Sequence, residues 1–118
     1  RRLEGPGLTM DDATHDKIQE IVDSKPVVLF MKGTRLFPRC GFSATVVEVL
    51  KRSGITDFQD VDVLKDPAIR QGIKEFTNWP TIPQLYVNGE FVGGCDIVRD
   101  MYEKGELEAV LADAKPSA

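Results

Sequence analysis

The fold is decided by one stretch of the sequence, VVLFMKGTRLFPRCGFS, which spans residues 27–43. Its first part, Val27–Lys32, is apolar and β-branched, which predicts a buried strand. A loop that contains glycine and proline follows at Gly33–Arg39, and a helix is expected to begin around Cys40–Ser43. Gly54 is a plausible end for this helix. The stretch therefore places a cysteine where a loop after a strand turns into a helix.

The segments on either side of this stretch supply the other elements. Thr9 and Asp12 resemble a capping box, which predicts a first helix from about Thr9 to Ser24. Asn88-Gly89 between two β-rich runs is a strong hairpin signal. The remaining expected elements are a short strand over Phe58–Val63, a helix opened by Asp66-Pro67, hairpin strands over Gln84–Val87 and Glu90–Gly93, a helix capped by Asp96 that runs to about Lys104, and a short helix over Glu106–Ala114.

This order of elements predicts an α/β fold with a four-stranded mixed sheet flanked by helices on both faces. The first two strands and the helix between them form a right-handed crossover with parallel strands. The hairpin then adds antiparallel strands. This is the order of thioredoxin-like proteins. One domain is expected to span residues 9–118, with residues 1–8 as a disordered leader, left by a processed transit peptide or by cloning.

The 118-residue chain has the composition of a soluble globular domain, with 42% hydrophobic and 29% charged residues. Its formal net charge of −4 lacks the basic excess of a nucleic-acid binder, so no nucleic-acid partner is expected. No apolar run approaches the ~20 residues of a membrane helix, so no membrane partner is expected either. Two cysteines and one histidine cannot form a structural zinc site or a disulfide framework. A soft-metal site would have to borrow ligands from a second chain or a small molecule.

Cys40 is the first candidate for chemistry, because a helix start and cationic neighbours both favour its thiolate form. Unpaired backbone N–H groups and the positive end of the helix dipole stabilise the anion. Lys32, Arg35 and Arg39 add positive charge nearby. Ser43 stands where a Cys-x-x-Cys protein has its second thiol, so Cys40 would work as a single thiol or with an outside partner. The alternatives are a buried, unreactive cysteine at 40 and a serine that caps a backbone N–H group.

Two later turns could also face a ligand. Pro83 stands immediately before a strand, and a cis Ile82–Pro83 bond would leave the backbone of Ile82 facing a ligand. A trans loop proline is the alternative. Residues 93–96, Gly-Gly-Cys-Asp, precede a helix whose N-terminal amides would suit a carboxylate. The alternative there is a tight turn with Asp96 as the helix cap.

Lys32 and Arg70 are the basic residues that we assign to an anionic ligand. Lys32 ends the first strand, at the carboxyl edge where α/β sheets bind ligands, and Arg70 lies in the first turns of its helix. Either residue could instead be ordinary solvated surface. Cys95 taken alone is expected to be a buried small hydrophobe, and Trp79 is expected to pack in the core or a loop.

Together these motifs resemble the monothiol glutaredoxins of the Cys-Gly-Phe-Ser class. The resemblance extends from about Thr9 to Ala114, and residues 32–47 look most like the plastid members of plants and algae. No second thioredoxin-like domain is seen, so the chain resembles a short, single-domain member. The resemblance rests on four co-linear stretches: Met31–Thr34, Phe37–Ser43, Asn78–Tyr86 and Gly93–Asp96.

The resemblance implies which residues bind glutathione. The two basic residues would pair with its glycine carboxylate. Ile82, held by a cis bond to Pro83, would hydrogen-bond its cysteinyl backbone, and residues 95–96 would hold its γ-glutamyl end. The full implied set is Lys32, Arg70, Ile82, Pro83, Cys95 and Asp96.

The resemblance also implies that Cys40 is the reactive thiol and a ligand of a [2Fe–2S] cluster in a homodimer. Such a cluster takes four thiolates, which two Cys40 side chains and two glutathione thiols would supply. The apo protein is expected to be a monomer. The implied function is transfer of the cluster to recipient apoproteins. The alternative is a glutathione-dependent oxidoreductase that removes glutathione from protein thiols. The implied compartment is the plastid stroma, with the mitochondrial matrix or the cytoplasm as alternatives.

Overall fold

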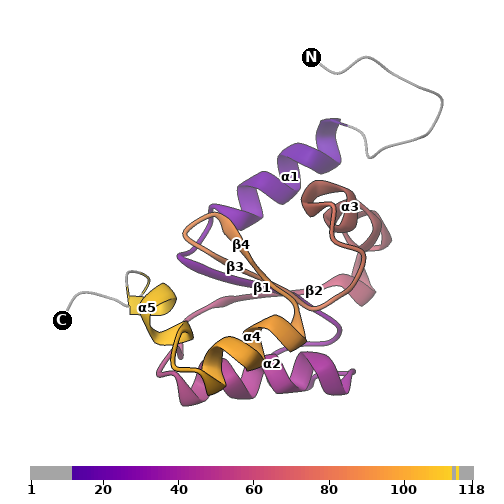
Figure 1. The fold of residues 1–118 in the computed structure, drawn as a ribbon. Helices are drawn as coiled ribbons and strands as arrows, with labels where there is room; N and C mark the ends of the chain where they lie inside the picture. The colour runs from indigo at the N-terminus through magenta and orange to yellow at the C-terminus, as the bar shows by residue number, and fades with distance from the viewer. Residues whose placement is uncertain (1–11, 113, 115–118) are drawn as a thin grey trace.

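The computed structural model describes residues 12–112 and residue 114. Figure 1 shows a central sheet with helices on its two faces. The expected leader at 1–8 and the expected cap at Thr9 lie outside the described residues. In chain order the elements are α1 (Asp12–Val22), β1 (Val27–Met31), α2 (Gly41–Arg52), β2 (Gln59–Asp62), a 3₁₀ turn η1 (Val63–Lys65), α3 (Pro67–Thr77), β3 (Gln84–Val87), β4 (Glu90–Gly93), α4 (Cys95–Glu103) and α5 (Leu107–Ala112).

The sheet has the strand order β2-β1-β3-β4, which confirms the predicted mixed sheet and thioredoxin-like fold. Strand β1 pairs with β2 in parallel and with β3 antiparallel, and β3 pairs antiparallel with β4. The β3–β4 turn is Asn88-Gly89, with φ of 52° and 81°. Two positive φ angles are what a type I′ hairpin turn requires. The hairpin signal in the sequence is therefore confirmed.

Strand β1 is buried along its whole length because helices cover both faces of the sheet. On one face Leu29 and Met31 pack with side chains of α2, α4 and α5. On the other face Val28 and Phe30 pack with side chains of α1 and α3. Figure 1 shows these two groups of helices on opposite sides of the sheet. Burial on both faces explains why this strand reads as a continuous apolar run rather than an alternating one.

The structure corrects two of the expected boundaries. Helix α4 begins at Cys95 with Gly94 as its N-cap, so the prediction that Asp96 caps this helix is wrong. Asp96 instead lies in the first turn. Strand β2 ends at Asp62 rather than at Val63, because the Asp62 carboxylate accepts a hydrogen bond from the Leu64 N–H at 3.0 Å and starts the 3₁₀ turn.

Candidate functional site

Cys40 is the N-cap residue of α2, with an extended backbone (φ −150°, ψ 135°) and a partly exposed side chain. The backbone N–H of Ser43 makes the largest contribution to lowering the pKa of its thiol. The Phe42 N–H and the charge of Lys32 lower this pKa further, while partial burial opposes them. The guanidinium of Arg35, which the sequence placed near Cys40, lies over the Phe58 ring, 3.8 Å from the ring centroid. The start of α2 therefore favours the thiolate.

Ser43 is fully buried and serves a structural role. Its Oγ accepts a hydrogen bond from the Lys32 backbone N–H at 3.1 Å. The Lys32 carbonyl in turn accepts from the Arg39 N–H at 2.8 Å. These bonds tie the first turn of α2 to the end of β1 and close the loop between them. The serine thus caps an N–H group, but one that belongs to the preceding strand rather than to its own helix.

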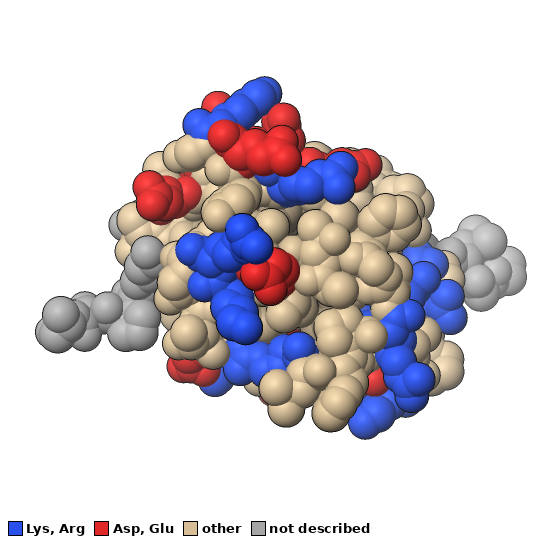
Figure 2. Space-filling view, turned by 90° about the horizontal axis from the view of Figure 1, so that it is seen from below, with Lys and Arg blue, Asp and Glu red and all other residues tan. Residues whose placement is uncertain are grey.

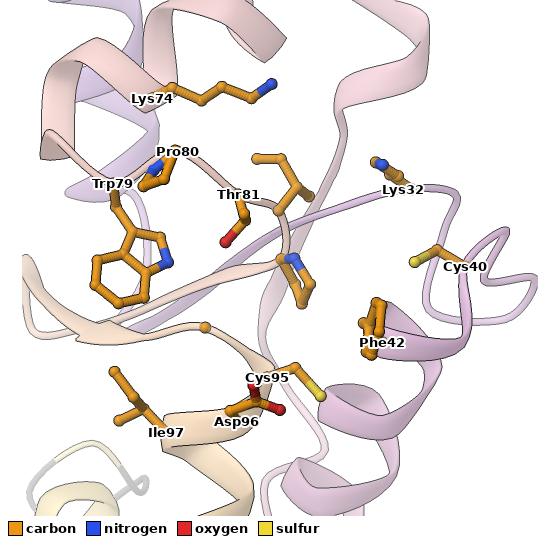
Figure 3. Close-up of a pocket in the computed structure, with 13 residues that line it drawn as sticks. Lys32, Cys40, Phe42, Lys74, Trp79, Pro80, Thr81, Cys95, Asp96 and Ile97 are labelled. Atoms are coloured by element: carbon orange, nitrogen blue, oxygen red, sulfur yellow. The ribbon is translucent and has the colours of Figure 1, made fainter.

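The Cys40 thiol lines a pocket of about 450 Å³ between the ends of several elements. Figure 3 shows Lys32 and Lys74 along one rim and Asp96 at the opposite rim, with Thr81 between them. Sites of this size suit a small molecule. The lining residues are Lys32, Cys40, Phe42, Lys74, Trp79, Pro80, Thr81, Ile82, Pro83, Gly94, Cys95, Asp96 and Ile97.

The wall formed by residues 79–83 is held by the fully buried side chain of Gln84. Its Nε2 donates to the carbonyls of Trp79 and Thr81 at 3.0 and 3.2 Å, and its Oε1 accepts from the Thr77 hydroxyl at 3.1 Å. The Tyr86 hydroxyl donates to the same Oε1 at 3.3 Å, and burial raises the pKa of this tyrosine. The hydrogen bonds of Gln84 therefore hold residues 79–83 from the core side, and the side of the loop that faces the pocket remains available for a ligand.

The bond between Ile82 and Pro83 is cis, as the ligand-binding interpretation of this turn expected. Both residues line the pocket and are buried. Within the described residues, the backbone of Ile82 makes no hydrogen bond of its own. An N–H and a C=O without partners beside a pocket are available to pair with an extended peptide-like ligand.

The start of α4 forms the opposite wall of the pocket. Gly94 lies so close to Trp79 that a Cβ there would stand 3.2 Å from the indole Nε1. Cys95 is buried, and burial raises the pKa of its thiol, so the two cysteines differ in character. Asp96 is exposed and forms a surface ion pair with Arg99 at 3.4 Å. The first backbone N–H groups of this helix can donate hydrogen bonds to an anion.

Several lining residues were not among the binding residues predicted from the sequence, and two of them, Lys74 and Trp79, carry groups that can contact a ligand. Arg70 is exposed on α3 and does not line the pocket, whereas Lys74, four residues later, does. The two share a helical face, so the i, i+4 spacing could have suggested Lys74. Trp79 lines the pocket rather than only packing in a loop, and its Nε1 is buried without a hydrogen-bond partner. Its place beside Ile82–Pro83 in the sequence was the only signal for this role.

A thioredoxin-like sheet with a single accessible cysteine at a helix start, facing a cis-proline, defines a class of thiol proteins. The comparison with protein families narrows this class, since the glutaredoxin family model matches residues 27–92. This chain belongs to the glutaredoxin family, and its relatives place it among the monothiol members. An uncharacterized monothiol glutaredoxin of Synechocystis sp. is 54% identical over 108 residues, which are 92% of this chain and 100% of that protein.

Two further relatives carry organelle names. The chloroplastic monothiol glutaredoxin-S7 of Oryza sativa is 57% identical over 93% of this chain and 64% of that protein. The mitochondrial monothiol glutaredoxin-5 of Saccharomyces cerevisiae is 52% identical over 83% of this chain and 67% of that protein.

Solved structures give the same fold. Reduced apo GrxS14 of poplar is 49% identical, with a TM-score of 0.74 over 84% of this chain and 90% of that one. The holo form of poplar glutaredoxin C1 is 28% identical, with a TM-score of 0.79 over 91% and 94% of the two chains. A buckwheat glutaredoxin–glutathione complex is 26% identical, with a TM-score of 0.75 over 86% and 90%.

None of the helices that the described residues form combines the length and the apolar character needed to cross a membrane. Nowhere in the same residues do three or more His, Cys, Asp or Glu side chains gather so that they could hold a metal ion.

Proposed function

We propose that this monothiol glutaredoxin binds glutathione in the Cys40 pocket, holds a [2Fe–2S] cluster between two copies, and transfers it to recipient apoproteins. The observation that carries the proposal is the partly exposed Cys40 thiol with a lowered pKa, on a pocket with cationic groups at one rim and helix amides at the other. A buckwheat relative forms a glutathione complex, which supports the same ligand here.

The chemistry of glutathione matches the two ends of the pocket. Its glycine carboxylate suits the rim with Lys32 and Lys74. Arg70 is exposed and lies outside the pocket, so it would contact the carboxylate only by reaching in from the surface. Its γ-glutamyl end carries a carboxylate and an ammonium group, which suit the α4 amides and the Asp96 carboxylate. Its peptide backbone would pair with the free N–H and C=O of Ile82. In this pose the glutathione thiol points toward Cys40.

The number of accessible thiols in the chain suits a cluster shared between two copies. A [2Fe–2S] cluster takes four sulfur ligands. Cys40 is the one accessible thiol of the chain, because Cys95 is buried and burial raises its pKa. Two Cys40 thiolates and two glutathione thiols complete the set. The cluster is cargo: two of its ligands belong to a diffusible molecule, which allows the cluster to leave.

The test is anaerobic purification with glutathione, followed by a visible absorption spectrum and analysis of iron and sulfide. We expect about one [2Fe–2S] cluster for each pair of chains. A chain that binds no iron under these conditions, while Cys40 remains reduced and alkylatable, would contradict the proposal.

A monothiol oxidoreductase is the second candidate, and the lowered pKa of Cys40 favours it. The Cys40 thiolate would attack the glutathione sulfur of a protein–glutathione mixed disulfide and release the protein thiolate. A second glutathione thiolate would then attack the Cys40–glutathione disulfide, which regenerates Cys40 and yields oxidised glutathione. The buried Ser43 cannot resolve the intermediate, so turnover must depend on free glutathione. Release of a glutathionylated protein thiol, followed against glutathione concentration, measures this activity.

The relatives with organelle names support a proposal for the compartment. We propose the plastid stroma as its compartment, which the chloroplastic rice relative supports; the mitochondrial matrix, supported by the mitochondrial yeast relative, and the cytoplasm are the alternatives. Localisation of a fluorescent fusion of the full-length gene product would decide among the three.

A further inference from the structure

A second cleft, which shares no lining residue with the Cys40 pocket, lies along the other side of α2. It measures about 510 Å³ and is formed by the loop after β1, by α2, and by residues 55–58 before β2. Leu36, Val47 and Ile55 give it an apolar lining, and Arg35 and Lys51 give it positive charge. The start of α2 separates this cleft from the pocket, so a ligand here would leave the Cys40 thiol free.

The positive charge of this cleft is only partly neutralised from within, because Lys51 lies near Glu48 but two cationic residues, Arg35 and Lys51, face this one lining carboxylate. Among the described residues, no carboxylate hydrogen-bonds to the guanidinium of Arg35, and its Nη2 is buried without a partner. Asp57 lies within electrostatic range of Arg35 but forms its ion pair with Lys25. Glu48, the acidic residue of the cleft, hydrogen-bonds to Arg52 at 2.8 Å. Figure 2, viewed from the side of α2 and α4, shows Lys and Arg side chains grouped around uncharged surface on a protein of net charge −4.

The loop at the edge of the cleft presents apolar side chains on a fastened backbone. The N–H of Gly33 donates to Asp62 at 3.0 Å, and the N–H of Arg35 donates to Asp60 at 2.8 Å. At the tip, Leu36 is 78% exposed and Phe37 is 73% exposed. Adjacent large apolar side chains that stay exposed to water next to an apolar cleft are typical of a protein-binding surface.

We propose that this cleft and the tip of its loop form a docking site for a protein segment that combines acidic and apolar residues, presented by a recipient of the cluster. The proposal rests on the proposed function for the identity of the partner, but not for the binding itself. A second copy fits poorly, because a symmetric contact would bring Arg35 and Lys51 against their own equivalents. The acidic residues of the segment would meet Arg35 and Lys51, and its apolar residues would cover Leu36 and Val47.

The test uses a fluorescein-labelled peptide in which aspartate and glutamate alternate with leucine, and a second peptide with lysine in place of the acidic residues. Fluorescence anisotropy on apo protein should show binding of the acidic peptide alone, weakened by salt. Lys51→Glu should weaken this binding about tenfold, because an attraction becomes a repulsion. Leu36→Ser should weaken it independently. Lys104→Glu makes the same charge change at the C-cap of α4, outside the cleft, and should leave the binding nearly unchanged.

Equal loss with Lys51→Glu and Lys104→Glu, or equal binding of both peptides, would overturn the proposal. Dimerisation of the apo protein through this face, detected by light scattering and abolished by Lys51→Glu, would assign the cleft to a second copy and also overturn it. Cys40→Ser separates the two proposals, since it should remove the cluster and leave binding of the acidic peptide intact. If the unmodified protein binds the acidic peptide but binds no iron, the proposed function is rejected and the docking proposal stands.

Discussion

The backbone N–H of Lys32 donates a hydrogen bond to the buried hydroxyl of Ser43, at a distance of 3.1 Å. This contact joins the residue that ends the first strand to the first turn of the helix that carries Cys40. The position that holds a second thiol in a Cys-x-x-Cys protein is therefore used here to fix the loop that presents the first thiol. The absence of a local dithiol and the placement of Cys40 have one structural origin.

Ser43→Ala should destabilise the protein by about 1–3 kcal/mol, because it leaves the Lys32 N–H buried without an acceptor. Denaturant unfolding monitored by circular dichroism measures this loss. Ser24→Ala is the matched control, since the Ser24 side chain is exposed and its hydroxyl donates to the Ile21 carbonyl three residues earlier. Equal losses of unfolding free energy in the two variants would show that the hydrogen bond to the Lys32 N–H stabilises the protein no more than a surface hydrogen bond does.

Cys40→Ser should abolish cluster binding, because a hydroxyl is a poor substitute for a soft thiolate ligand. Cys95→Ser should retain much of the cluster, since the Cys95 side chain is buried and burial raises the pKa of its thiol. Iron and sulfide are measured in both variants and in the parent after reconstitution with glutathione. Equal contents in Cys40→Ser and the parent would remove Cys40 from the ligand set.

The alkylation rate of Cys40 should rise with pH to a midpoint below the ~8.5 of a free cysteine, because the Ser43 N–H lowers the pKa of the thiol. Iodoacetamide labelling followed by mass spectrometry, in a Cys95→Ser background, measures the midpoint. Between the pKa of Cys40 in the folded chain and about 8.5, its value in the unfolded chain, the folded chain holds less of the thiol proton than the unfolded chain does. The contribution of Cys40 to stability is therefore present above the unfolded pKa and lost as pH falls through the folded pKa. A midpoint at or above that of free cysteine would reject the assignment.

Lys74→Ala should weaken glutathione binding about tenfold, because it removes a charge-assisted contact to a carboxylate at the pocket rim. Lys32→Ala should act in the same direction. Arg70→Ala should have a smaller effect, since Arg70 does not line the pocket. Calorimetric titration of apo protein with glutathione ranks the three variants. A larger loss for Arg70 than for Lys74 would mean that α3 turns toward the pocket when the ligand binds.

Oligomeric state should follow the cluster. The apo protein is expected to be a monomer, and reconstitution with glutathione is expected to give a dimer, because one chain offers a single accessible thiol. Lys32→Ala should weaken the dimer indirectly, through loss of glutathione. Light scattering on apo and reconstituted protein, with and without glutathione, measures this. A stable apo dimer, or a holo monomer formed without glutathione, is the result that would refute the shared-ligand arrangement.

The features that the sequence predicted well depend on neighbours along the chain. The doubly buried strand at 27–31, the Asn88-Gly89 turn and the placement of Cys40 at a helix start all follow from residue type and local spacing, because backbone conformation responds to the side chains beside it. The cap predicted at Asp96 is the exception. Two glycines precede this helix, and its N-cap is Gly94, two residues before the predicted cap.

The site depends on contacts between residues far apart in the sequence, and only the tertiary structure decided these. The position of α3 relative to the sheet brings Lys74 to the pocket and leaves Arg70, one turn earlier on the same face of the helix, outside it. The packing of α4 against α2 buries Cys95, Gly94 lies against the Trp79 indole, and the Arg35 guanidinium lies over the Phe58 ring. No local sequence pattern predicts these contacts, because each depends on how helices and strands from distant parts of the chain pack against one another in the core.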